Sequence, residues 1–373
     1  MNEDRASRYH RLKRRTALVS AIAGVAGLAA LVMTPASASL AAWAADLSSG
    51  FSSPWRPALA IALVAGTLAL GWEALSFPFV FYRTFLLDRK YGLSSEPVTT
   101  WLADHCKALA LGFVLTLGAA LAVYAAMYLS PDRWWFIVAA LFAGAAAVIA
   151  GVAPILLLPL FYRFQPLDRE ALRERLLTLS TRAGVRVLGV FEWGLGEKTS
   201  RANAALAGAG RTRRILVSDT LLKNYSDDEI EVVLAHELAH HVHHDLWTAL
   251  ALETAIVSTA LHGAHLTATY ASPALGLGGA ADLAALPLLA LGGGAVSLLL
   301  APLSNAWSRH NERRADRFAL TLTGRPAAFV SAMRRLGAQN LAEERPPRLA
   351  FWFFHTHPTM DERIARARAF KSA

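Results

Sequence analysis

The sequence predicts a mainly α fold, a multi-span transmembrane helical bundle that carries a small α+β insert. Three observations support this prediction. Hydrophobic residues make up 54% of the 373 residues, charged residues only 17%, and the mean hydropathy is +0.35, whereas soluble domains contain about 25% charged residues. Six apolar stretches are each about 20 residues long, enough to cross a bilayer as helices. A long polar segment separates the fourth stretch from the fifth.

The six predicted spans are residues 16–34, 57–75, 108–129, 134–153, 246–270 and 286–303. The fifth contains Glu253, His262 and His265, so we expect it to face protein or a water-filled cavity and not lipid. The chain then divides into four parts. They are a membrane region with four transmembrane helices (1–162), a soluble catalytic segment (163–245), two further spans (246–303) and a helical region (304–373).

Lysine and arginine residues orient the predicted spans. Six of them precede Thr16, and most of the others lie at 83–107, at 163–223 and from Arg309 onward. The opposite connections contain Arg56 and Arg133, and none at all between 271 and 285. Basic loops stay on the cytoplasmic side of a membrane. We therefore expect a multi-pass protein of the cell membrane with the polar segment and both termini in the cytoplasm.

The net charge of +9 is explained by this topology. No basic stripe with interleaved aromatic residues appears in the soluble part, so no nucleic-acid partner is expected. The N-terminus also allows a second interpretation, because Arg14-Arg15, an apolar run and Ala36-Ser37-Ala38 resemble a cleavable signal peptide. Cleavage would leave five spans and remove the N-terminus from the charged side, so the six-span prediction is preferred.

Residues 163–245 form the predicted α+β insert. Residues 168–183 have the pattern of an amphipathic helix that Gly184 ends, and 185–193 and 213–218 are strand candidates. Ser226 and Glu229 have the spacing of a capping box at the start of a further helix. Beyond Gly324 another helical region is predicted, ending at residues 353–358.

The most informative motif is His236-Glu237-Leu238-Ala239-His240. Residues four apart lie on one face of a helix, so both imidazoles can bind a single zinc ion while Glu237 projects beside them as a base. The alternative is a His-rich solvated helix end, since His241, His243 and His244 follow directly.

A hydrolytic zinc site needs a third protein ligand and an open position. Glu312 is the candidate, in a helical segment where Asp316 lies one turn further and can sit behind a ligand histidine. Without the upstream motif, the same segment would be interpreted as a charged surface helix with i,i+4 pairs. Cys106 is the only cysteine, which excludes a Cys-rich zinc site and an intrachain disulfide.

From about Pro78 to the C-terminus, the chain resembles the type I CAAX prenyl endopeptidase family of integral-membrane zinc metalloproteases, gluzincin-type enzymes that combine HExxH with a downstream Glu. The resemblance rests on motifs in the same order along the chain: Phe77-Pro78-Phe79 with Tyr91-Gly92, Asp104 with Lys107, Pro154 and Pro159-Leu160-Phe161, Phe164-Gln165-Pro166-Leu167, Ser200-Arg201-Ala202-Asn203-Ala204, the zinc helix, Asn305 to Asp316, and His357-Pro358 with Arg363-Ile364.

The resemblance implies roles for individual residues. His236, His240 and Glu312 would bind one Zn²⁺ per chain, and Glu237 would act as general base and acid. Asn203 would lie on an edge strand beside the substrate backbone. His357 would stabilise the oxyanion. Asp316 and Arg363 would lie behind the zinc ligands and hold them in place without contacting the metal. Family members also enclose a large water-filled chamber, which would account for the polar fifth span.

The chain departs from the family in two ways. Its connections are shorter, and six spans are predicted where the family usually has seven. The expected function is a membrane-embedded zinc endopeptidase whose partners are the bilayer and peptide or protein substrates associated with it. Three interpretations remain: processing of CAAX-like C-termini, quality control of damaged membrane proteins, or a non-catalytic zinc-binding scaffold. An intact Glu237 argues against the scaffold, because a structural site needs no base between its histidines.

Overall fold

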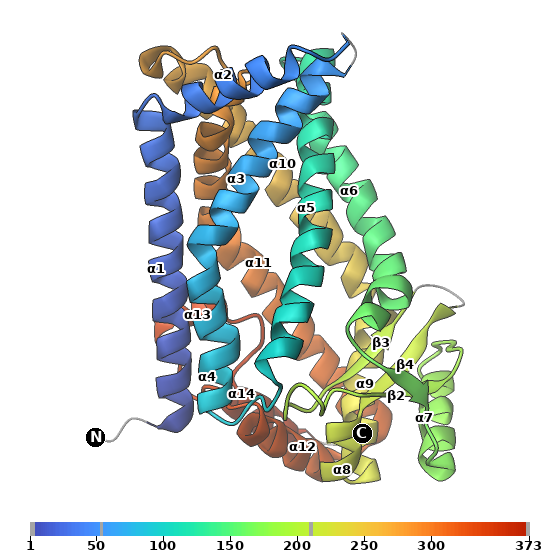
Figure 1. Cartoon of the computed structure of the whole chain (residues 1–373). Helices are drawn as coiled ribbons and strands as arrows, with labels where there is room; N and C mark the ends of the chain where they lie inside the picture. Colours follow the sequence, from blue (N-terminus) through green and yellow to red (C-terminus); the bar gives the residue numbers. More distant parts are fainter. Residues whose placement is uncertain (1–3, 53–54, 209–211, 371–373) are drawn as a thin grey trace.

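The computed structural model describes residues 4–52, 55–208 and 212–370. Long helices form a tall bundle, and a small sheet with shorter helices lies at one end of it (Figure 1). Among the described residues, five helical stretches are long and apolar enough to cross a membrane: Arg5–Met33, Arg56–Lys90, Val98–Leu129, Trp134–Leu160 and Leu283–Thr323.

These stretches contain several elements. They are α1 (Arg5–Met33), α3 (Arg56–Phe81) with η1 (Tyr82–Leu86) and α4 (Leu87–Lys90), α5 (Val98–Leu129), α6 (Trp134–Val152) with η2 (Ala153–Leu157) and η3 (Leu158–Leu160), and η6 (Leu283–Ala285) with α11 (Leu286–Thr323). Helix α2 (Ala36–Ser48) lies across the end of the bundle opposite the sheet (Figure 1).

The predicted fifth span, 246–270, is a helix, α10 (Asp245–Ala271), but it is not among the five stretches that are apolar enough. The six-span prediction is therefore corrected to five apolar spans plus α10. The physical reason is that Glu253, His262 and His265 lower the hydropathy of α10. Helix α10 packs between α6 and α11. Its polar groups contact protein: Glu253 accepts a hydrogen bond from Ser304, and His265 Nδ1 lies 3.1 Å from Trp134 Nε1.

Close packing of α10 on α11 depends on glycine. A Cβ atom at Gly292 would lie 2.4 Å from Thr267 Oγ1 and 2.7 Å from Thr267 Cβ. One at the adjacent Gly293 would lie 3.3 Å from the carbonyl oxygen of Ala260. Small residues at helix interfaces let two backbones approach closely inside a membrane. This contact therefore keeps the polar helix α10 beside α11.

Gly292→Leu is expected to destabilise the bundle by about 1–3 kcal/mol, the range for overpacking a close-packed contact. The measurement is thermal unfolding of the purified protein in detergent. Gly294→Leu is the matched control, because nothing lies within 4 Å of a Cβ at that position. Equal stability of the two variants would contradict the assigned helix contact.

Helix α11 connects the bundle to the insert. It runs unbroken for 38 residues, across the predicted division at residue 303, and contains Glu312 in its second half. Pro302 lies inside it and Gly324 ends it in a left-handed conformation, φ 64°. The last predicted span and the segment with the proposed third ligand are thus one rigid element, so the membrane helix itself positions Glu312.

The insert contains a four-stranded sheet of order β1-β2-β4-β3. The strands are β1 (Phe164–Pro166), β2 (Val190–Trp193), β3 (Ala204–Ala207) and β4 (Arg214–Ser218). Strands β2 and β4 are parallel, whereas β1 and β3 pair antiparallel with them. The two strands predicted from sequence form the centre of the sheet, although β2 occupies only the last four residues of 185–193. Strand β3 forms one edge.

Shorter helices complete the insert: α7 (Glu170–Arg182), α8 (Asp219–Asn224), α9 (Asp227–Val242), α12 (Pro326–Gln339), α13 (Arg348–Phe354) and α14 (Met360–Ala369). One apolar core joins α7, α9, α12 and the sheet, with Leu176, Ile215, Ile230 and Phe329 fully buried in it. The helical region predicted to end at 353–358 continues, because α14 follows Pro358. Its N-cap is Thr359, whose side chain accepts a hydrogen bond from the amide of Glu362.

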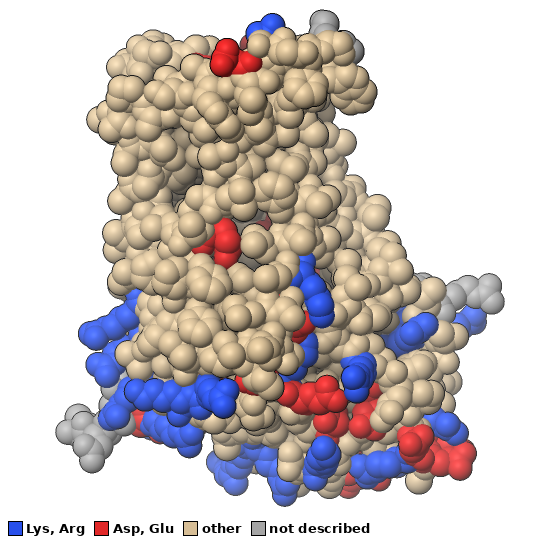
Figure 2. All heavy atoms as spheres, viewed as in Figure 1, with Lys and Arg blue, Asp and Glu red and all other residues tan. Residues whose placement is uncertain are grey.

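The first turns of α1 pack against the insert. Tyr9 is buried and donates to Asp88, 2.6 Å away, and Arg201 contacts the same carboxylate at 3.2 Å. Arg14 pairs with the buried Glu343. The segment that also resembles a signal peptide is therefore an integral part of the fold beside the catalytic segment. Lys and Arg residues gather around the sheet end of the bundle on the face that Figure 2 shows.

Candidate active site

Helix α9 carries the HExxH residues, and a capping box defines the residue at which it begins. The predicted capping box is present: the Ser226 side chain accepts from the Glu229 amide, and the Glu229 side chain accepts from the Ser226 amide. Most of α9 is buried between the sheet, α11 and α12. The rings of His236 and His240 lie on one face of it, with their centroids 5.0 Å apart.

Helix α11 brings Glu312 to the two histidines. Glu312 Oε2 lies 3.1 Å from His236 Nε2, and Glu312 Oε1 lies 3.5 Å from His240 Nε2. One donor atom from each of the three residues lies within 4.8 Å of the others. The three residues proposed from sequence as metal ligands are therefore brought together.

The donor set fits a zinc ion. Each histidine uses Nδ1 for a carboxylate, Asp316 at 2.9 Å from His236 and Asp245 at 2.8 Å from His240, which leaves both Nε2 atoms facing Glu312. Glu312 Oε2 is buried and accepts no hydrogen bond of ordinary geometry from the described residues. Zinc is bound in this way by two imidazoles and one carboxylate, with the second imidazole nitrogen held by a further carboxylate.

Asp316 and Arg363, predicted to lie behind the proposed ligands, are both placed on the Nδ1 side of the His236 ring. Asp316 accepts two hydrogen bonds from Arg363, at 2.9 and 2.6 Å, and both residues are buried. Arg363 also approaches His236 Nδ1, at 3.4 Å. The guanidinium therefore holds the Asp316 carboxylate in place against the histidine ring. Helix α14, which sequence reasoning missed, is what positions Arg363.

Asp245 is a functional candidate that sequence reasoning missed. Its carboxylate contacts His240 Nδ1 and also accepts from Arg314. It lies five residues after His240, a spacing that no straight helix brings onto one face. The chain makes this contact because His244 adopts a left-handed conformation, φ 57°, which ends α9 and starts α10. The only sequence signal was an acidic residue directly after a His-rich helix end.

Neighbouring charges and burial shift the pKa values of side chains in the site. Burial would lower the pKa of His236, but the contacts with Asp316 and Glu312 outweigh it and raise the pKa. Glu237 differs, because burial, the largest influence, raises its pKa. A carboxylate whose pKa moves toward neutrality is suited to accept and return a proton.

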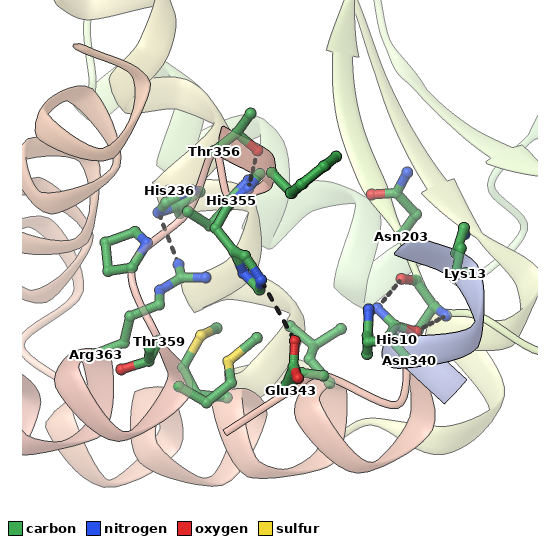
Figure 3. A pocket seen from close by; sticks show the side chains of 18 of the residues that line it. His10, Lys13, Asn203, His236, Asn340, Glu343, His355, Thr356, Thr359 and Arg363 are labelled. Atoms are coloured by element: carbon green, nitrogen blue, oxygen red, sulfur yellow. Dashed lines mark hydrogen bonds and ion pairs between the residues drawn. The ribbon is translucent and has the colours of Figure 1, made fainter. Parts of the chain in front are cut away.

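Glu237 faces a cavity of about 600 Å³ that lies against α9. His236, Arg363, His357 and Asn203 also line it (Figure 3). His357 is exposed, and its Nε2 lies 3.3 Å from Glu312 Oε1. Asn203 immediately precedes the edge strand β3. The cavity has the size of a small-ligand or peptide site, roughly 300–1,000 Å³, and all the site residues proposed from sequence lie in its wall or directly behind it.

A second cavity, of about 400 Å³, lies on the bundle side of the ligands. His240, Asp245 and Glu312 line it, together with Glu253 and Ser304 from the long helices. The ligand residues therefore separate one cavity at the sheet from another among the helices. This explains why Glu253 is tolerated in α10, since it faces a cavity that it shares with His240 and Glu312 and not lipid.

Fold and site together define a class of protein, a metallopeptidase built into a helical membrane bundle. The chain belongs to peptidase family M48, whose family profile matches residues 166–371. Residues 2–163 match a second profile, described as CAAX prenyl protease N-terminal, five membrane helices. The resemblance inferred from the motifs is thereby confirmed. The protein is a multi-pass membrane metalloendopeptidase that acts on peptides or proteins, and the family uses zinc.

Similar proteins agree with this assignment. The chain is 29% identical over 290 residues to "Uncharacterized metalloprotease YhfN" of Bacillus subtilis, covering 76% of this chain and 67% of that one. It is 26% identical over 320 residues to CAAX prenyl protease 1 of Saccharomyces cerevisiae, covering 78% and 68%. The crystal structure of S. mikatae Ste24p superposes with a TM-score of 0.81 at 20% identity, over 96% of this chain and 87% of that one. The predicted fold class is confirmed.

Proposed function

We propose that this chain hydrolyses peptide bonds of membrane-associated or CAAX-like substrates, at the cytoplasmic face of the cell membrane, with Glu237 as general base. One observation carries the proposal. Glu237 and His236 open onto one peptide-sized cavity at the basic end of a membrane bundle, and His240 and Glu312 lie beside His236 and complete the proposed ligand set. A purely structural metal site has no use for a base or a cavity.

The proposed mechanism assigns one role to each side chain. A zinc ion held by His236, His240 and Glu312 supplies Lewis acidity and lowers the pKa of water. Glu237 takes the proton of the attacking water and returns it to the leaving amine. His357, on the open side of Glu312, donates to the developing oxyanion. Asn203, at the start of the edge strand, binds the substrate backbone, since an unpaired strand edge can accept an extended peptide.

Asp316 and Asp245 act through the histidines. Each accepts from an Nδ1 atom, which fixes the ring orientation and would raise the basicity of the Nε2 atom available to a zinc ion. Arg363 and Arg314 in turn hold these carboxylates. Asp316 and Asp245 lie on the Nδ1 side of the histidine rings, so neither carboxylate is expected to touch the substrate.

The orientation rests on the charge distribution. The first turns of α1, the connection from α4 to α5, and the whole insert lie at the sheet end, where Lys and Arg concentrate (Figure 2). Basic segments stay on the cytoplasmic side. The proposed location of the active site and both termini is therefore cytoplasmic.

A cysteine at Ala274 is expected to react with an impermeant thiol reagent added to intact cells, whereas one at Glu174 is not. Ala274 is exposed in the turn between α10 and α11, at the opposite end of the bundle from Glu174, which is exposed on α7. The background carries Cys106→Ser, because Cys106 is exposed. Labelling of position 174 but not 274 would place the site across the membrane and exclude a cytoplasmic substrate.

The substrate class is tested by comparing membranes of cells that express wild type or Glu237→Gln. Proteins that keep extra C-terminal residues only in the variant membranes would support action on CAAX-like C-termini. Accumulation of damaged multi-span proteins would replace this with quality control. Identical membrane proteomes, together with no hydrolysis by the purified wild type, would leave the non-catalytic scaffold.

A further inference from the structure

The wall of the catalytic cavity carries more positive than negative charge. Four Lys and Arg side chains line it, Lys13, Arg14, Arg83 and Arg363, against the two carboxylates of Glu237 and Glu343. Two of these four cations already form ion pairs with carboxylates. Arg363 is bonded to Asp316, and Arg14 to Glu343. The excess therefore comes from Lys13 and Arg83.

Neither Lys13 nor Arg83 forms an ion pair with any residue that the structure describes. Lys13 donates to the Tyr9 hydroxyl at 3.2 Å. The nearby Asp88 is engaged by Tyr9 and Arg201. Arg83 is partly buried and makes no hydrogen bond with the part of the chain that the structure describes. Two unpaired cations in the half-buried wall of one cavity repel one another, and an anion bound in the cavity would relieve this.

The backbone around Arg83, which lines the cavity, is irregular. Arg83 lies in η1, a π-helical turn between α3 and α4, shortly after Pro78. A π turn inserts extra backbone and rotates the following side chains, and such turns are frequent at functional sites. Lys13 reaches the same cavity from α1. Two membrane helices thus each direct one cation into a cavity whose catalytic residues belong to α9.

Lys13 lies where an extended substrate would reach. In Figure 3, His10 and Lys13 lie on the same side of the cavity as Asn203, while His236 and Arg363 lie across from them. A peptide that pairs with the strand edge at Asn203 and extends away from Glu237 therefore meets Lys13.

We propose that Lys13 and Arg83 form a carboxylate-binding subsite in the catalytic cavity, which anchors an anionic group of the peptide substrate. This rests on the proposed peptidase function and specifies its substrate. The carboxylate is supplied either by the C-terminal end of the chain or by an acidic side chain near the cleaved bond. A guanidinium and an ammonium at partly desolvated positions suit a carboxylate, because such charge-assisted hydrogen bonds are the strong ones.

Binding is measured first, in a form that needs no catalysis. The probe is a fluorescent eight-residue peptide with uncharged apolar side chains, made as the free acid, as the C-terminal amide, and as an amide with Glu as its last residue. The protein is zinc-loaded Glu237→Gln in detergent micelles. We expect the free acid to bind about 10- to 100-fold more tightly than the plain amide, the value of one charge-assisted hydrogen bond. The Glu-ending amide shows whether a side chain can replace the terminal carboxylate.

Lys13→Gln/Arg83→Gln should remove this preference, and Arg83→Lys should retain most of it. Arg15→Gln/Lys90→Gln is the matched control, because both residues are exposed, neither lines the cavity, and the net charge falls by the same amount. Thermal unfolding of each variant separates lost binding from lost folding. In the wild type, the same peptides should differ in KM more than in kcat.

Equal binding of acid and amide, or an equal loss for both on removing Lys13 and Arg83, would overturn the subsite. In that case the two cations serve the anionic membrane surface or the fold. Failure of the proposed peptidase function gives a different result. The wild type would then hydrolyse none of the peptides, while the acid-specific binding to Glu237→Gln would persist.

Discussion

Glu237→Gln is expected to leave zinc bound and to reduce peptide hydrolysis by about 10²- to 10⁴-fold, the contribution of a positioned general base. The amide has nearly the shape of the carboxylate but cannot accept a proton from water. Glu237 is partly buried and makes no ion pair with the ligand residues, so its replacement leaves the contacts of His236, His240 and Glu312 intact. Metal content by elemental analysis and kcat/KM on one peptide are measured on the same preparation.

Glu362→Gln is the matched control for this variant. Glu362 has the same chemistry and lies on α14, but it pairs with Arg313 and Arg366 away from the cavity. Its replacement should leave kcat/KM nearly unchanged. Activity of Glu237→Gln close to wild type, with zinc retained, would show that another group takes the water proton. Loss of zinc in that variant would show instead that Glu237 is part of the metal site.

The local parts of the site were predictable because their signals are local. Helix α9 begins at a capping box and places His236 and His240 one turn apart, and both features depend only on residues within one helix. Asp316 follows from Glu312 in the same way, since both lie on one face of α11. Within one helix, spacing determines which side chains lie together, so the sequence contains the information.

Contacts between elements were not predictable in the same way. Asp245 meets His240 only because the chain reverses at His244, and no periodic pattern encodes that turn. Strand β3 has the residues Ala-Ala-Leu-Ala, which have no strong preference for a strand. It is extended because it pairs with β4, from Ala204 opposite Val217 to Ala207 opposite Arg214.

The basic residues of α1 show a different limit. Their clustering before Thr16 predicted a cytoplasmic N-terminus. Because membrane topology explained all of these basic residues, the sequence offered no reason to assign any of them to the active site. The structure adds a second role, because Lys13 and Arg14 line the catalytic cavity while Arg15, on the same helix, is exposed. A topology signal and a binding residue have the same sequence pattern. Only the packing of α1 against the insert separates them.

Glu312→Ala is expected to abolish zinc binding at stoichiometric metal, whereas Asp316→Ala and Asp245→Ala should each weaken zinc affinity by only about 10- to 100-fold. Glu312 offers its oxygen to the Nε2 atoms of both histidines, so its loss removes a ligand. Asp316 and Asp245 contact Nδ1 atoms, so their loss frees the rings but leaves three ligands in place. Zinc affinity is measured by competition with a chromophoric chelator.

Amide substitutions at these positions sharpen the test of zinc affinity. Asp245→Asn keeps an acceptor for His240 Nδ1 and should retain more affinity than Asp245→Ala. Glu312→Gln should remain severely impaired, because zinc binding needs the charged oxygen.

The two supporting carboxylates also differ in their effect on stability. Asp316→Ala leaves the buried Arg363 without its carboxylate, so it should lower the thermal stability more than Asp245→Ala, whose partner Arg314 is more exposed. If Glu312 proved dispensable for zinc while Asp316 or Asp245 proved essential, the ligand and the supporting carboxylate would be exchanged, and the metal would lie on the Nδ1 side of the rings.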